Sequence, residues 1–110
     1  MDKYRVRITR QARDHLREIR RHIQTVLLSP IAAKNTIAAL KEEMKSLDTM
    51  PERVHLTPEE PWRSQGIRRL QVKNYYVYFW VDEEMKKVQV IGVIYVHREQ
   101  TRQLELMEME

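Results

Sequence analysis

The sequence predicts a small α+β domain with an N-terminal strand, then an antiparallel helix hairpin, then an antiparallel β-meander. Apolar residues recur at every second position near the N-terminus and again beyond Gly66, and at every third or fourth position between them. A period of two is typical of strands and a period near 3.6 of amphipathic helices. With 110 residues the chain has the size of one domain. We therefore expect residues 1–110 to form a single unit.

The first element is a strand with one face in solvent. Tyr4, Val6 and Ile8 alternate with Arg5 and Arg7, and this alternation is the mark of a half-buried strand.

A first helix follows the strand, and Thr9 is its expected N-cap. Its apolar stripe comprises Ala12, Leu16, Ile19, Ile23 and Val26. A row of arginines occupies another face: Arg10, Arg13, Arg17 and Arg20. Such a row is either an ordinary solvated face or a docking face for an acidic partner, and both interpretations stay open.

A second helix starts at Ser29-Pro30, where serine caps and proline takes the first helical position. Its apolar stripe comprises Ala33, Ile37, Leu40, Met44 and Leu47. Because almost no loop separates the two stripes, the helices should form an antiparallel hairpin.

The segment from Pro51 to Gly66 is irregular and contains three prolines. A loop this long in a small domain is often functional or mobile. Within it, Trp62 either stacks on a base or closes the edge of the core.

Three strands complete the chain, at Ile67–Val72, Tyr75–Val81 and Val88–Val96. The last is apolar at almost every position, as expected for a central strand covered on both faces. In the middle strand Val77 and Phe79 share one face, and the neighbouring aromatic residues take the other. The tail, residues 99–110, is expected to be either a short helix or disordered.

Composition narrows the class of protein. The formal net charge of +4 and the pI of about 9.5 favour an acidic partner, either nucleic acid or an acidic protein segment. Without cysteine there are no disulfides or thiolate metal sites. The histidines are too scattered to indicate a metal, and no glycine-rich loop indicates a nucleotide cofactor, so we expect neither. No apolar run resembles a signal peptide or approaches the ~20 residues that span a bilayer. We expect a cytoplasmic protein without a membrane partner.

Basic residues mark the start of the meander. Arg69 and Lys73 should project to one face of the strand and Arg68 to the other. Their charge either protects an edge strand from aggregation or contacts phosphate, because a guanidinium group binds phosphate oxygens in bidentate fashion. Arg63, in the preceding loop, could add to a nucleic-acid surface.

A second basic site follows the central strand, where His97 and Arg98 leave a rigid sheet. Arg98 is a candidate phosphate contact, and His97 is a candidate acid or base near neutral pH.

These residues together resemble the RelE/ParE superfamily of toxins from type II toxin–antitoxin systems, which includes plasmid stabilisation proteins. The resemblance covers nearly the whole chain and depends on the order and spacing of several short motifs. They are Tyr4–Ile8 with Gln11-Ala12, Met50-Pro51-Glu52-Arg53, Gly66–Leu70, Val72–Tyr75, Val77–Glu83, Lys87–Ile91 and His97-Arg98.

The resemblance implies a toxin held inactive by a cognate antitoxin, and one of two activities. RelE-like members cut messenger RNA on the ribosome without metal, using basic side chains around the 2'-hydroxyl. ParE-like members inhibit DNA gyrase and are not nucleases. A third alternative is a degenerate member that serves mainly as an antitoxin-bound repressor module.

Under the nuclease interpretation the resemblance assigns catalytic roles to Arg68, Lys73 and Arg98, with His97 as a candidate acid or base. Arg63, Arg69 and Arg102 would bind nucleic acid. Two departures count against this interpretation. Tyr76 stands where many RelE-like chains have arginine, and Thr101 and Arg102 occupy the stretch where nucleases commonly have tyrosine. Because the basic groove is retained, the sequence favours the ribosome-dependent endoribonuclease over the gyrase inhibitor by a small margin.

Overall fold

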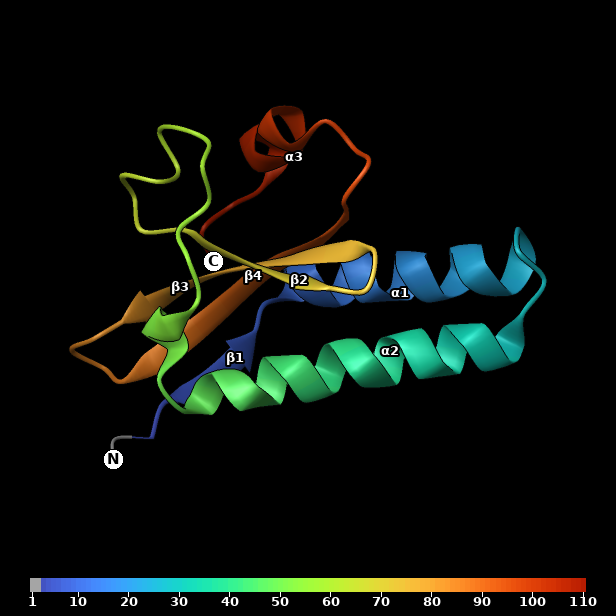
Figure 1. Ribbon diagram of the computed structural model, residues 1–110, viewed down its shortest axis with the longest axis horizontal. Helices are drawn as coiled ribbons and strands as arrows, with labels where there is room; N and C mark the ends of the chain where they lie inside the picture. Colours follow the sequence, from blue (N-terminus) through green and yellow to red (C-terminus); the bar gives the residue numbers. More distant parts are fainter. Residues whose placement is uncertain (1–2) are drawn as a thin grey trace.

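The computed structural model describes residues 3–110 and shows a four-stranded sheet between two helical layers (Figure 1). The first two residues of the predicted domain lie outside this range. The elements in chain order are β1 (Arg5–Ile8), α1 (Arg10–Thr25), α2 (Pro30–Lys45), the 3-10 turns η1 (Ser46–Asp48) and η2 (Pro51–Arg53), β2 (Arg68–Val72), β3 (Tyr75–Asp82), β4 (Lys87–Tyr95) and α3 (Gln100–Leu106). This order confirms the predicted α+β fold class.

The sheet has the strand order β1-β4-β3-β2, and β1 runs parallel to β4 while the other pairs are antiparallel. The meander is thus confirmed, and the N-terminal strand makes the sheet mixed. A bulge interrupts the β3–β4 ladder, because Tyr78 pairs with Gly92 and Phe79 with Val90. Ile91 is the extra residue. The central position predicted for the last strand is confirmed, since every residue from Val88 to Ile94 is buried.

Both helix starts form as predicted. The Thr9 side chain accepts a hydrogen bond from Ala12 N (3.3 Å), and the Ser29 hydroxyl accepts one from Ala32 N (3.2 Å). The placement of Val26 in the buried stripe is wrong. Helix α1 ends at Thr25, so the Val26 side chain turns outward and is 62% exposed.

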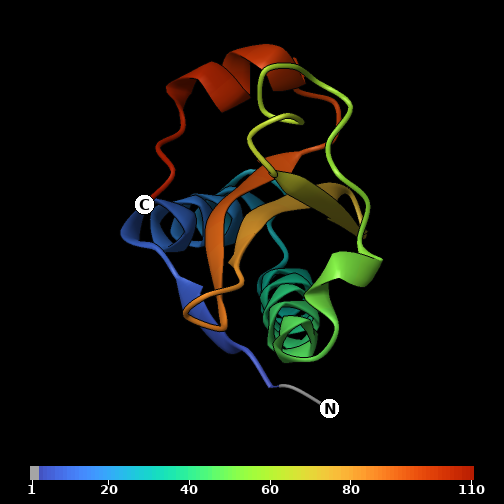
Figure 2. The same cartoon turned by 90° about the vertical axis from the view of Figure 1, so that its left-hand side faces the viewer.

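Two apolar cores lie on opposite faces of the sheet, with α2 on one side and α3 and the loop before β2 on the other (Figure 2). The larger core includes Leu16 of α1, Leu40 of α2 and Phe79 of β3. The smaller core includes Tyr78 of β3 and Leu104 of α3. The alternation of β3 side chains between the two cores agrees with the pattern expected from the sequence.

The smaller core also holds the loop and the tail in place. Trp62 packs against this core, as the core alternative for that side chain predicts. The loop also pairs with the residue just before β2, because Thr57 N donates to Ile67 O (2.8 Å). At the C-terminus Trp80 Nε1 donates to Met109 O (2.8 Å).

Within residues 3–110 none of the helices has both the length and the apolar character needed to cross a bilayer.

Candidate functional site

A groove of about 670 Å³ opens where the end of the sheet meets the α1–α2 hairpin. The α1 and α2 side chains form one wall, and the β2–β3 turn, the end of β4 and the residues after it form the other. The polar and aromatic residues at the groove are His15, Glu18, His22, Thr36, Lys73, Asn74, Tyr75, Tyr95, Arg98 and Gln103. The apolar floor and rim include Ile19, Ile23, Leu27 and Val93. The groove therefore combines cations, aromatic rings and aliphatic surface.

Lys73 reaches this groove from a tight turn between β2 and β3. Its φ of 54° is in the left-handed region, which costs energy for a residue with a side chain. Two hydrogen bonds hold the turn: Gln71 Nε2 donates to Lys73 O (3.2 Å), and Val96 N donates to Asn74 O (2.9 Å). The turn thus holds an exposed lysine beside the segment that follows β4.

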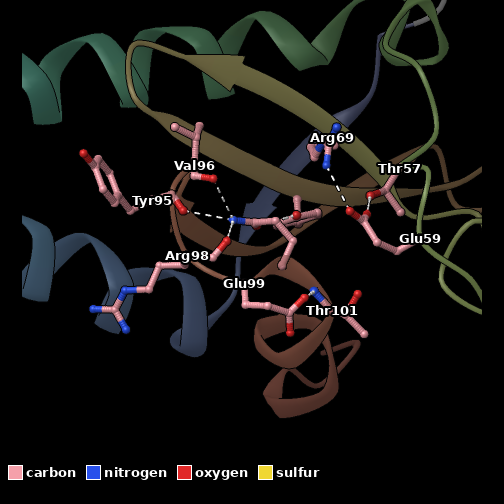
Figure 3. Close-up of polar contacts among 10 residues, drawn as sticks. Thr57, Glu59, Arg69, Tyr95, Val96, Arg98, Glu99 and Thr101 are labelled. Atoms are coloured by element: carbon pink, nitrogen blue, oxygen red, sulfur yellow. Dashed lines mark hydrogen bonds and ion pairs between the residues drawn. The ribbon is translucent and has the colours of Figure 1, made fainter.

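Arg98 reaches the same groove, and its backbone is held by Gln100. The amide nitrogen of Gln100 donates to Arg98 O (2.7 Å) and Tyr95 O (3.0 Å), while its amide oxygen accepts from the Tyr78 hydroxyl (2.7 Å). Burial raises the pKa of Tyr78 to about 12, so this phenol stays a donor at neutral pH. The Arg98 guanidinium itself extends away from these contacts (Figure 3).

Arg68 and Arg69 lie outside the groove, and both guanidinium groups have partners within the protein. The Arg68 guanidinium donates to Val54 O (2.6 Å) and Glu52 O (3.3 Å). Arg69 forms an ion pair with Glu59 (3.2 Å), and its guanidinium carbon lies 4.1 Å from the centre of the Tyr76 ring. The two side chains project to opposite faces of β2, as the alternation predicts. Figure 3 shows the Arg69 and Arg98 side chains pointing apart.

The remaining candidates do not line the groove either. Arg63 is exposed on the loop before β2. The His97 ring is exposed and packs edge-on against Tyr95, with ring centres 5.2 Å apart. Arg102 is exposed on α3, where its backbone N–H donates to the capping Glu99 side chain (3.0 Å). Of the seven basic or histidine candidates, the structure brings together Lys73 and Arg98.

Sequence reasoning missed the role of His15. Its Nδ1 accepts a hydrogen bond from Val93 N of β4 (3.1 Å). Burial lowers the pKa of His15 and outweighs the opposing effect of Glu18 and Asp14. The signal was its spacing: His15 lies four residues before Ile19 and three after Ala12, at the edge of the buried stripe. Over residues 3–110 there is no cluster of three metal-ligating side chains.

Comparison with known proteins identifies the fold and the family. The family model described as "ParE toxin of type II toxin-antitoxin system, parDE" matches residues 6–100. No curated protein matches the chain.

Solved toxin–antitoxin structures share the fold. The chromosomal ParDE system of P. aeruginosa gives a TM-score of 0.71 at 24% identity, over 86% of this chain and 98% of that one. The RelBE2 complex of Mycobacterium tuberculosis gives 0.62 at 23% identity, over 84% and 98%. A mutant E. coli toxin RelE in the free state gives 0.63 at 14% identity, over 92% of both chains. Because the family model spans most of the sequence, the chain belongs to the ParE toxin family of type II toxin–antitoxin systems, within the RelE/ParE superfamily.

Proposed function

We propose that this toxin arrests growth by binding a protein target, DNA gyrase, as ParE-type toxins do, and that it acts in the cytoplasm. The observation that carries the proposal is the separation of the residues that a nuclease would need. Stabilising a phosphorane requires donors that converge to about 3 Å from one phosphate group. Here Lys73 and Arg98 share a groove. The Arg68 guanidinium lies elsewhere and donates hydrogen bonds to backbone carbonyls. The ParE family match supports the same proposal.

We propose that the groove receives the cognate antitoxin. Solved structures with this fold include toxin–antitoxin complexes. The groove offers aliphatic surface at Ile19 and Leu27 beside the cations Lys73 and Arg98. An amphipathic segment with acidic side chains would match both features. If charge neutralisation contributes, raising the salt concentration weakens this complex, and Lys73→Ala reduces the salt dependence.

A ribosome-dependent messenger RNA endoribonuclease is the second candidate. The observation in its favour is that Lys73 and Arg98 lie at one groove together with two histidines. In such an enzyme the 2'-hydroxyl of the RNA loses its proton to a base and attacks the adjacent phosphorus. The P–O bond to the 5'-oxygen of the next nucleotide breaks, that oxygen takes up a proton, and a 2',3'-cyclic phosphate remains, while basic side chains stabilise the transition state.

Brief induction of the toxin in bacterial cells separates the two candidates. A DNA-damage reporter and co-purification of gyrase measure the proposed activity, and mapping of new messenger RNA 5' ends measures the second. We expect growth arrest, a reporter response and gyrase capture without in-frame cuts on translating ribosomes. In-frame cuts that disappear in Arg98→Ala but persist in Arg10→Ala would establish the endoribonuclease instead. Arg10 is the matched control because it is an exposed arginine of α1 outside the groove. Absence of arrest would mark a degenerate member.

A further inference from the structure

The edge of β4 changes partner halfway along the strand. Strand β1 pairs with β4 only as far as Ile8 and Val90, and Thr9 N donates the next hydrogen bond to Val90 O (3.0 Å). Beyond this point the chain enters α1 and offers no further backbone partner. Buried backbone groups need partners, so side chains of α1 have to supply them.

Two α1 side chains one turn apart take over this edge. Gln11 Nε2 donates to Ile91 O (2.7 Å), and His15 Nδ1 accepts from Val93 N (3.1 Å). Residues four apart lie on one helix face, which is why a glutamine and a histidine can follow the same strand.

The C-terminal tail is tied into the same place. Gln11 Nε2 also donates to Glu108 O (3.1 Å), and Glu108 N donates to Gln11 Oε1 (3.0 Å), so the side-chain amide pairs with the tail as a peptide group would. Gly92 leaves the space that the tail uses. A methyl group at Gly92 would overlap Met107 Sδ and would lie 3.2 Å from His15 Cε1. Helix α1, strand β4 and the tail therefore meet at Gly92, next to the His15 ring.

The contact with Val93 fixes the protonation state of His15. An N–H donor points at Nδ1, so Nδ1 must offer its lone pair and the neutral ring carries its proton on Nε2. In an imidazolium Nδ1 also carries a proton. The Nδ1–H would then face the Val93 N–H, and neither donor would have an acceptor there.

We propose that His15 is a proton-sensitive latch: its protonation releases Val93 and loosens the C-terminal tail, residues 107–110, from β4. This inference concerns a property of the fold and does not depend on the proposed target.

The charges around the latch act in both directions. The titratable and charged groups that line the groove with His15 are Glu18, His22, Lys73, Tyr75, Tyr95 and Arg98. Asp14 adjoins His15 on α1, and Glu108 of the tail bonds to Gln11. The carboxylates Asp14 and Glu18 favour the protonated ring, whereas burial disfavours it and dominates, so the folded-state pKa lies below the ordinary 6.5. The latch is thus closed at neutral pH. It opens as the pH falls below 6.5 toward the folded-state pKa.

Amide hydrogen exchange measured by NMR at pH 7.5 and pH 5.0 tests the latch, after correction for the intrinsic exchange rate. We expect the protection of the Val93 amide to fall by about tenfold at the lower pH, the change in opening that one net hydrogen bond supplies. The amides of the tail should lose protection with it.

Two variants make the test specific. His15→Asn keeps an acceptor near the position of Nδ1 but cannot titrate. In this variant the protection of the Val93 amide should therefore not depend on pH. His22→Asn removes an exposed groove histidine of the same helix and should behave like the unmodified protein. Unchanged protection in the unmodified protein, or an equal loss in His15→Asn, would overturn the proposal.

A measurement on the unmodified protein remains decisive if His15→Asn does not fold. The ring ¹⁵N shifts at pH 7.5 should show an unprotonated Nδ1 and a protonated Nε2. The opposite tautomer, or a ring still protonated at pH 7.5, would overturn the latch.

Discussion

Replacing Gly92 by alanine probes the packing of the tail on the sheet. The added methyl group overlaps the Met107 sulfur and comes within 3.2 Å of His15 Cε1. The Met107 side chain can avoid the methyl group only by leaving its place against the smaller core, and His15 is held by its bond to Val93 (3.1 Å). The substitution should therefore displace the tail while leaving helices α1 and α2 and the sheet in place.

The expected cost follows from overpacking. Inserting a methyl group into a filled site typically costs about 1–3 kcal/mol. For a chain of 110 residues, each kcal/mol corresponds to a decrease in Tm of about 4 °C. Gly92→Ala should therefore lower Tm by roughly 4–12 °C.

Thermal and urea unfolding of Gly92→Ala, Met107→Ala and the double variant measure this cost and its origin. If the clash with Met107 is the cause, the double variant should be more stable than the sum of the two single changes predicts, by about 1 kcal/mol or more. Strict additivity, or no loss in Gly92→Ala, would refute this placement of the tail.

Three further predictions concern the core, a buried phenol and an arginine. Leu40→Ala removes a side chain with 0% exposure and should lower the free energy of unfolding by about 2–5 kcal/mol. Because the pKa of Tyr78 is raised to about 12 in the folded state, stability should fall as the pH rises from 10 to 12, and Tyr78→Phe should remove most of this dependence. Arg68→Ala removes the donors to Val54 O and Glu52 O and should cost about 1–3 kcal/mol in urea unfolding.

Variants at exposed positions serve as controls for these predictions. Leu28→Ala, at a side chain that is 80% exposed, and Arg10→Ala should change the free energy of unfolding by less than about 0.5 kcal/mol. Equal effects at Leu28 and Leu40 would contradict the assignment of the core. If the Tyr78 phenol itself titrates near pH 10 in the folded protein, its burial is contradicted. If the Arg68→Ala variant is as stable as the Arg10→Ala variant, the hydrogen bonds assigned to Arg68 do not stabilise the fold.

The fold could be predicted because its signals are local. Periodicity defines the strands and helices, and the caps at Thr9 and Ser29 define where the helices start. The prediction failed at Val26, where helical periodicity continues in the sequence but the helix itself ends one residue earlier. Periodicity describes a face and does not determine where a helix stops.

The candidate site could be predicted only in part. Alternation correctly assigned Arg68 and Arg69 to opposite faces, but the partners of Arg68 are carbonyls 14 and 16 residues earlier, in a loop whose path is set by tertiary packing. Lys73 and Arg98 are 25 positions apart in the sequence and share a groove because the β3–β4 hairpin folds back on itself. His15 was missed because its partner is a backbone N–H of β4, which the sequence does not indicate.

The central claim is that this toxin acts on a protein and not on RNA, and a DNA supercoiling assay tests it most directly. Purified DNA gyrase, relaxed plasmid and ATP are incubated with increasing amounts of the purified toxin, and supercoiled and cleaved plasmid are then separated on a gel. We predict that the toxin inhibits supercoiling in a dose-dependent way and that the antitoxin restores it. Unchanged supercoiling at a toxin concentration that cuts messenger RNA on purified ribosomes would contradict the account.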